Sequence, residues 1–79
     1  MTANQETAID QNERLHALVE RLNVVHYINK TRTVVFVSIP IEEHQIEVDV
    51  ESFIYNNWFN VEDIEISESH LSYLIDLKQ

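Results

Sequence analysis

The fold is decided by residues 33–39, TVVFVSI, a run in which β-branched and aromatic side chains follow one another almost without interruption. Such a run is typical of a strand. Its near-continuous apolar character predicts burial on both faces, and hence a central position in a sheet. Pro40 follows directly and fits the end of a strand, where a missing N–H does no harm. We therefore expect a sheet built around residues 33–39.

A second strand is predicted just before this one. Residues 24–28, VVHYI, are β-branched and aromatic, and residues 29–32, NKTR, have the composition of a turn. The two strands would then form a hairpin. A helix that continues through residue 28 is the alternative for this stretch.

Two stretches after Pro40 alternate between apolar and acidic residues, as half-buried strands do. They are residues 45–50, QIEVDV, and residues 61–66, VEDIEI. The side chains expected to face inward are Ile46, Val48, Val50, Ile64 and Ile66. The side chains expected to face outward are Glu47, Asp49, Asp63 and Glu65, with Glu51 extending the first row.

Three helices complete the prediction. Residues 5–22 carry apolar side chains at intervals of three, four and seven, and Thr2 with Gln5 has the form of a capping box. Residues 51–59 predict a short helix, and Ser67 is a suitable N-cap for a C-terminal helix. The side chains expected to be buried are Phe53, Ile54, Tyr55 and Trp58 in the short helix and Leu71, Leu74, Ile75 and Leu77 in the C-terminal one. The chain is thus expected to be one α+β domain over residues 1–79, with helices on one face of an antiparallel sheet of three or four strands.

Charge is distributed unevenly along the chain. Residues 1–38 hold four acidic and four basic residues, whereas residues 39–79 hold ten acidic residues and a single base, Lys78. The net charge of -9 therefore belongs to the second half. Ordinary surfaces intersperse both signs, and a one-sided excess is tolerated for solubility or for a basic partner.

The acidic residues of the second half are the candidate partner-binding site. Alternate residues of a strand lie about 6.8 Å apart, so one acidic row has about half the linear charge density of a DNA strand. A second row on a neighbouring strand would restore that density. We expect an acidic surface that imitates nucleic acid and occupies the cationic groove of a partner. The candidate residues are Glu42, Glu43, Glu47, Asp49, Glu51, Glu62, Asp63 and Glu65.

These patterns favour a non-enzymatic, cytoplasmic binding protein that blocks or regulates a basic, nucleic-acid-handling protein. A phage or mobile-element inhibitor, such as an anti-CRISPR or other anti-defence protein, would have this composition, and the cytoplasm would then be the host's. The alternative is a homodimer or adaptor subunit joined through the N-terminal amphipathic helix. Direct nucleic-acid binding is disfavoured because clustered Lys and Arg are missing. A membrane location is disfavoured because no apolar run is long enough to span a bilayer.

Catalytic and metal-binding motifs are not found in the sequence. Glycine and cysteine are absent, which excludes glycine-rich phosphate loops and thiolate sites. No nucleophile lies in a recognisable pattern with a base, so we expect neither an enzyme nor a cofactor. His16 and Glu20 lie four residues apart on the predicted helix, close enough to share a metal ion, but no third ligand follows at a recognisable spacing. We therefore expect no metal site.

Overall fold

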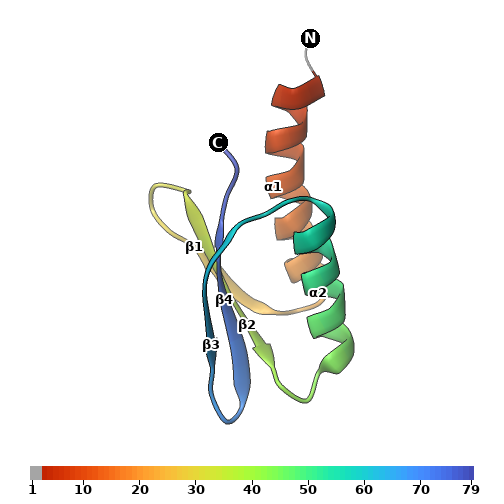
Figure 1. The fold of residues 1–79 in the computed structure, drawn as a ribbon, viewed down its shortest axis with the longest axis vertical. Helices are drawn as coiled ribbons and strands as arrows, with labels where there is room; N and C mark the ends of the chain where they lie inside the picture. The colour runs from red at the N-terminus through yellow and green to blue at the C-terminus, as the bar shows by residue number, and fades with distance from the viewer. Residues whose placement is uncertain (1–2) are drawn as a thin grey trace.

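The computed structural model of the chain describes the backbone of residues 3–79 and the side chains from Ala8 onward. Its elements are α1 (Ala3–Arg21), β1 (Val25–Ile28), β2 (Val34–Pro40), α2 (His44–Asn56), β3 (Val61–Ile66) and β4 (His70–Asp76). The strands form one antiparallel sheet in the order β1-β2-β4-β3, and both helices lie on the same side of it (Figure 1). The α+β architecture predicted from the sequence is confirmed. Thr2, half of the predicted capping box, lies outside the described residues.

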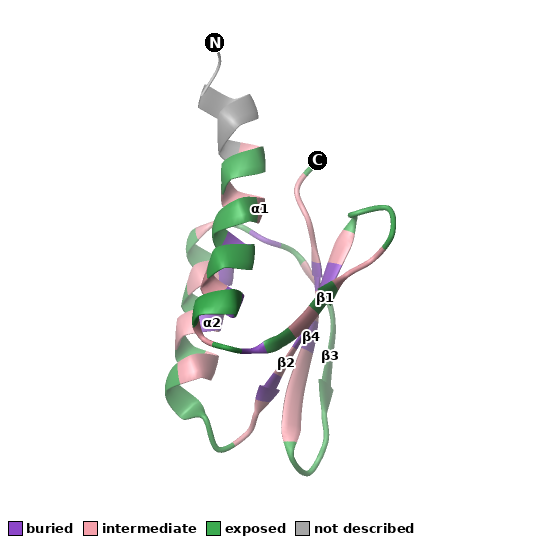
Figure 2. Ribbon diagram, turned by 180° about the vertical axis from the view of Figure 1, so that it is seen from behind, coloured by how far each residue is buried: buried purple, intermediate pink, exposed green. Residues whose placement is uncertain are grey.

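β2 occupies the centre of the sheet, as its sequence predicts. Its side chains Val35, Val37 and Ile39 are buried beneath the helices, where they meet core residues of α1, α2 and β4. Phe36 and Ser38 alternate with them and are only half-buried. Buried and intermediate stretches therefore follow one another along β2 (Figure 2). Burial is thus complete on one face alone, because both helices cover that same face. Neither helix, over the described residues, is long and apolar enough to cross a membrane.

The strand predicted over residues 45–50 is wrong, because these residues begin α2, which also includes most of the short helix predicted over residues 51–59. Ile46, Val50 and Ile54, one turn apart, form its core-facing stripe. Val50 belongs to both the alternating series and the helical series, which is why either period fits this stretch. Val48, expected to face inward, is exposed.

The C-terminal helix predicted after Ser67 is also wrong, because residues 70–76 form β4, which pairs with both β2 and β3. Leu71, Tyr73 and Ile75 form its core-facing series with a period of two. Ser67 closes the β3–β4 hairpin instead of a helix. Its N–H donates to the His70 carbonyl at 2.9 Å, and its Oγ accepts from the His70 N–H at 3.0 Å.

Both helices end in the same backbone motif, with one residue in the left-handed region. That residue is Asn23 after α1, at φ 61°, and Trp58 after α2, at φ 58°. The N–H of the following residue reaches back five positions, as from Phe59 to the Ile54 carbonyl at 3.1 Å. Asparagine tolerates this conformation, whereas a bulky side chain pays about 1–2 kcal/mol for it.

Candidate partner-binding surface

The order of the strands converts the charge asymmetry of the sequence into a spatial asymmetry. β1 and most of β2 come from the neutral half of the chain, whereas β4 and β3 come from the acidic half and form the other side of the sheet. Lys78, the one base of residues 39–79, donates to the Asn57 carbonyl at the end of α2 and lies 4.9 Å from the centroid of the Phe59 ring. This ammonium group therefore offsets the negative end of α2 rather than the carboxylates of β3.

β3 is an edge strand that presents different chemistry on its two faces. Within residues 3–79 it pairs with β4 alone, so its other side is an unpaired sheet edge, on which the Ile64 N–H donates to the Asp63 carboxylate at 3.0 Å. Asp63 and Glu65 lie opposite Leu74 and Ser72 of β4, on the open face of the sheet. Ile64, between them, points toward the helix side.

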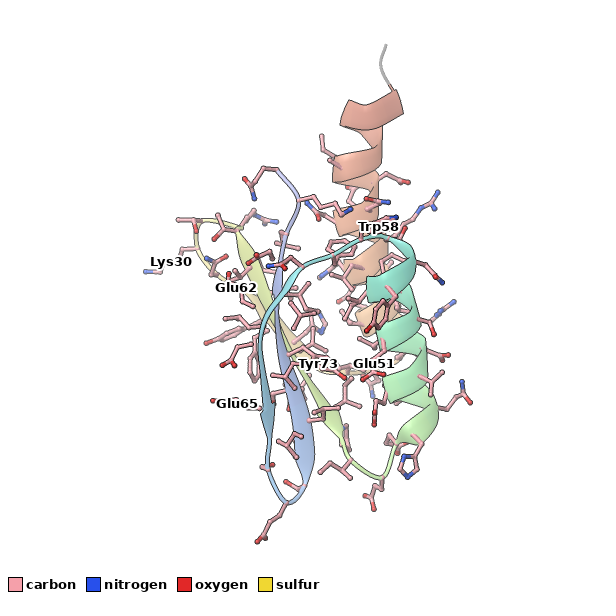
Figure 3. All side chains as sticks on the ribbon, viewed as in Figure 1. Lys30, Glu51, Trp58, Glu62, Glu65 and Tyr73 are labelled. Atoms are coloured by element: carbon pink, nitrogen blue, oxygen red, sulfur yellow. The ribbon has the colours of Figure 1, made fainter. Side chains whose placement is uncertain are left out.

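Three of the predicted residues, Glu62, Asp63 and Glu65, are gathered along this strand and are called the β3 acidic row below. Glu62 is the extra residue at a bulge between Val61 and Asp63, and Figure 3 shows Glu62 and Glu65 on the side of the sheet away from the helices. All three side chains are exposed. The row is therefore available to a partner that approaches the open face.

Asp76 of β4 adjoins the β3 acidic row. Its carboxylate is hydrogen-bonded to the Glu62 carboxyl group and accepts from Asn60 Nδ2 at 2.7 Å. The hydrogen bond and the charge of Asp76 raise the pKa of Glu62, and the bonds from Glu62 and Asn60 lower the pKa of Asp76. On acidification the pair therefore holds its first proton on Glu62.

The open face changes from acidic to apolar away from β3. The register places Asp63, Leu74, Phe36 and Tyr27 in one line across the four strands. The Tyr27 and Phe36 rings meet edge to face with their centroids 6.1 Å apart, and Tyr27 is largely exposed. A partner on this face would meet carboxylates first and aromatic side chains beyond them.

A groove of about 600 Å³ lies between α2 and the helix-facing side of β3, and is called the Trp58 groove below. Its lining is mainly apolar and aromatic, with Glu51 and Asn60 as polar members; the residues are Glu51, Ile54, Tyr55, Trp58, Phe59, Asn60, Val61, Ile64 and Tyr73. Tyr55 is 82% exposed and Trp58 is 86% exposed, so the prediction that both are buried is wrong. Tyr55 lies 100° around the helix from buried Ile54, and the left-handed turn at Trp58 sends Phe59 into the core instead.

The exposure of Ile64 and Ile66 in β3 is a further correction, since both are expected to face the core. They do lie on the helix side of the sheet, opposite Tyr73 and Leu71, yet they are 53% and 76% exposed. An edge strand has a neighbour on one side only, so its helix-facing residues are covered from fewer directions. The result is an apolar border along the Trp58 groove.

The predicted row of Glu47, Asp49 and Glu51 is divided by the helix that contains it. Glu47 and Glu51 are one turn apart and share a side of α2, whereas Asp49 lies on another side and accepts from Gln45 Nε2 at 3.0 Å. The Tyr73 hydroxyl donates to the Glu51 carboxylate, and the two side chains meet between the sheet and α2 (Figure 3). Burial, then this hydrogen bond and the charges of Glu51 and Glu47, raise the pKa of Tyr73.

The structure thus keeps part of the predicted site together and disperses the rest. Glu42 and Glu43 occupy the exposed loop before α2, apart in sequence from the β3 acidic row. Sequence reasoning missed Asp76, because the stretch that holds it was expected to be helical, and it missed the exposure of Trp58. No protein-family model and no curated protein matches the sequence.

Proposed function

We propose that the protein is a non-enzymatic binding protein that captures an extended basic segment of a partner protein along the edge of β3. The observation that carries this proposal is the asymmetry of that edge, with the β3 acidic row on one face and the Trp58 groove on the other. Side chains of an added strand point alternately to the two faces of the sheet. A partner strand with basic residues at alternate positions and apolar residues between them matches both faces.

The two faces would contribute differently to binding. Tryptophan and tyrosine are enriched among the residues that dominate binding energy, and Trp58 and Tyr55 offer large exposed rings at the groove. Exposed ion pairs contribute about 0–1 kcal/mol each, but they accelerate association and make it sensitive to salt. We therefore assign affinity mainly to the groove, and selection of a basic partner to the acidic row.

A foreign partner fits this surface better than a second copy of the chain. Pairing two β3 strands would bring like charges together across the strands, which is destabilising. The alternative dimer through α1 also has little to use, because Leu15 and Val19 are buried in the core. Ile9 is the exposed large apolar side chain among those described for α1.

We further propose that the partner is a nucleic-acid-handling protein, whose clustered Lys and Arg side chains normally hold phosphate. The β3 acidic row supports this proposal as a short stretch of negative charge beside a hydrogen-bonding edge. A longer imitation of nucleic acid built from two strand rows is not supported, because Glu47, Asp49 and Glu51 belong to a helix. Occupation of the partner's cationic groove would block or regulate it, as an anti-defence inhibitor does.

The test uses Trp58, the single tryptophan of the chain, as its own reporter. A short peptide that alternates Arg and Val is titrated into the protein while the emission of Trp58 is followed. We expect a blue shift that saturates at one peptide per protein, and protection of the β3 backbone amides from hydrogen exchange. A peptide of the same composition with its Arg and Val residues in two blocks should bind at least about tenfold more weakly, because it matches neither face.

Two double variants separate the β3 acidic row from net charge. Asp63→Lys with Glu65→Lys reverses the row and should weaken binding of the alternating peptide by at least about tenfold, because attraction at the row becomes repulsion. Glu42→Lys with Glu43→Lys makes the same change in net charge in the loop before α2 and should leave affinity within about twofold at moderate salt. Equal losses in both variants would show attraction by overall charge alone and would overturn the β3 edge as the site.

A further inference from the structure

Two histidines and a glutamate meet where α1 approaches β1. His16 and Glu20 lie one turn apart on α1, with 3.5 Å between His16 Nε2 and Glu20 Oε1. His26 of β1 pairs with buried Val37 and so points to the helix side of the sheet, where its ring meets that of His16 edge to face at 5.3 Å between centroids. The ligand atoms that these three side chains offer all lie within 4.8 Å of one another.

We propose that His16, Glu20 and His26 form a binding site for a zinc-class transition-metal ion. Two imidazoles and one carboxylate are a donor set that Zn²⁺ uses, with the fourth position left to water. Mg²⁺ and Ca²⁺ prefer oxygen ligands and would bind poorly to a set that is two-thirds nitrogen. The site is distinct from the proposed partner surface, because β1 and β3 are opposite edges of the sheet.

The hydrogen bonding of His26 suits this role. Its Nδ1 lies 2.7 Å from the Val24 carbonyl oxygen, and a carbonyl oxygen can only accept. Nδ1 of the neutral ring therefore holds the proton and donates it, which leaves the lone pair of Nε2 for a metal ion. Metal-binding histidines commonly have their second nitrogen fixed in this way, since the bond sets both the tautomer and the ring orientation.

The distances require only a small adjustment of side chains. Bonds of about 2.1 Å in a tetrahedral site place ligand atoms about 3.4 Å apart, which the His16–Glu20 separation of 3.5 Å already matches. The third ligand atom lies within 4.8 Å of the other two, so it must come closer by up to about 1.4 Å. The side chains of His16 and Glu20 are 46% and 63% exposed, so they can rotate without disturbing the core. A bound ion would tie α1 to β1 across the short connection between them.

The experiment is a calorimetric titration of tag-free, chelator-treated protein at pH 7.5 with Zn²⁺ and, separately, with Mg²⁺. We expect one Zn²⁺ per chain and a much weaker response to Mg²⁺. Zinc at a hundred times the dissociation constant should also raise Tm by at least about 5 °C. Long-range proton–nitrogen spectra should show His26 bound through Nε2 with Nδ1 still protonated, and Co²⁺ should give the intense visible absorption of a four-coordinate centre.

Variants assign the site. His16→Ala and Glu20→Gln change exposed residues of α1, and each should weaken zinc binding by about tenfold or more. His44→Ala and His70→Ala remove the two histidines outside the cluster and should leave zinc binding unchanged. Circular dichroism checks that every variant folds. Unchanged zinc affinity in His16→Ala and Glu20→Gln, or equal affinity for Mg²⁺, would overturn the site and leave the three side chains as a surface contact.

Discussion

Trp58 stands at the end of α2 in the backbone position that Asn23 occupies at the end of α1, and the two residues differ in what that position costs them. Both have positive φ, and the same pair of backbone hydrogen bonds closes each helix. Asparagine is among the residues best suited to this conformation, and tryptophan is among the least suited. Because Trp58 is 86% exposed, packing of its ring does not offset the unfavourable free energy of the left-handed backbone conformation. The proposed role in partner binding would account for a tryptophan at this position.

Replacing Trp58 with asparagine should separate stability from binding. We expect the free energy of unfolding to rise by about 0.5–1 kcal/mol in the Trp58→Asn variant, because left-handed strain is relieved and little contact area is lost. Affinity for the alternating peptide should fall at least about tenfold. Urea unfolding measures the first effect and calorimetry the second.

Tyr55→Asn is the matched control for this pair of effects. It removes an exposed ring from the same groove without changing a left-handed residue, so it should weaken peptide binding without stabilising the fold. A destabilised Trp58→Asn variant would contradict the strain argument, since it would show that the ring contributes to folding.

The Glu62–Asp76 pair predicts a pH dependence of stability. The pKa of Glu62 is raised in the folded state, so its stabilising hydrogen bond is present at low pH and is lost as pH rises through that raised pKa. Glu62→Gln keeps a donor to Asp76 that does not titrate. The difference in Tm between Glu62→Gln and the wild type should therefore shift in favour of the variant as pH rises from about 4 to about 7.

Thermal unfolding across this pH range measures the difference between the two proteins. The pKa of Asp76 is lowered in the folded state, so the stability that its carboxylate contributes is lost only as pH falls through that lowered pKa. This loss should be similar in the wild type and in Glu62→Gln. Glu65→Gln removes an equal charge from the same strand and should show a smaller pH-dependent gain. Parallel Tm curves for Glu62→Gln and the wild type would show that the two carboxyl groups do not interact.

At the scale of the elements, the sequence predicts α1, β1, β2, β3 and the C-terminal part of α2, but neither the first part of α2 nor β4. For α1, β2 and β3 one period fits and has no good competitor, whereas for β1 the alternative of a continuing helix is excluded only by the structure, in which α1 ends at Arg21. In the first part of α2, Val50 fits both the strand period and the helix period. Local sequence therefore does not decide between helix and strand, because that depends on the tertiary contacts of this segment. In β4, Leu71, Leu74 and Ile75 match a helix, and pairing with two neighbouring strands overrides that pattern. Tyr73, which the helical pattern ignores, is buried and lines the Trp58 groove.

A side-chain clamp between α1 and the C-terminal residues is the element-scale feature most open to test. Asn12 Nδ2 donates to the Lys78 carbonyl at 2.7 Å, and the Lys78 N–H donates to Asn12 Oδ1 at 2.9 Å. Asn12→Ala removes both bonds while improving helix propensity, so we expect a net loss of about 1–2 kcal/mol in the free energy of unfolding. Glu13→Ala, at the next and exposed position, should stay within about 0.5 kcal/mol of the wild type.

Urea unfolding checks the loss, and hydrogen exchange at Leu77 and Lys78 locates it. Release of the clamp should also free the Lys78 ammonium from the end of α2, since the same residue contacts Asn57 and Phe59. An Asn12→Ala variant as stable as Glu13→Ala would mean that other contacts hold these residues in place.

For the whole molecule, the sequence predicts that the candidate site is acidic, but it does not predict which residues lie together on each face of the sheet. The excess of acid after residue 38 is a property of composition, so it survives any fold. Which carboxylates share a surface depends on α2 being a helix and on β3 being an edge, and neither is a local property of the sequence. The exposed apolar part of the surface could not be predicted for the same reason. Trp58 and Ile64 are apolar, and the sequence pattern assigns such residues to the core because it does not show which side of an element stays uncovered.

Net charge and strand order together predict how self-association and partner binding respond to salt. At about 50 mM salt the screening length is about 14 Å, and the β3 acidic rows of two copies repel, so light scattering should give the 9.3 kDa monomer. At about 500 mM salt the screening length is about 4 Å. Self-association at about 500 mM salt should be at least as strong as at about 50 mM salt, because repulsion between copies is screened, whereas the complex with the alternating peptide should weaken.

An equimolar mixture of wild type and the Asp63→Lys, Glu65→Lys variant should form mixed dimers at low salt, because the facing charges of the two proteins are complementary. A wild-type dimer that forms at low salt and resists high salt would instead support the homodimer and remove the main argument for a basic partner.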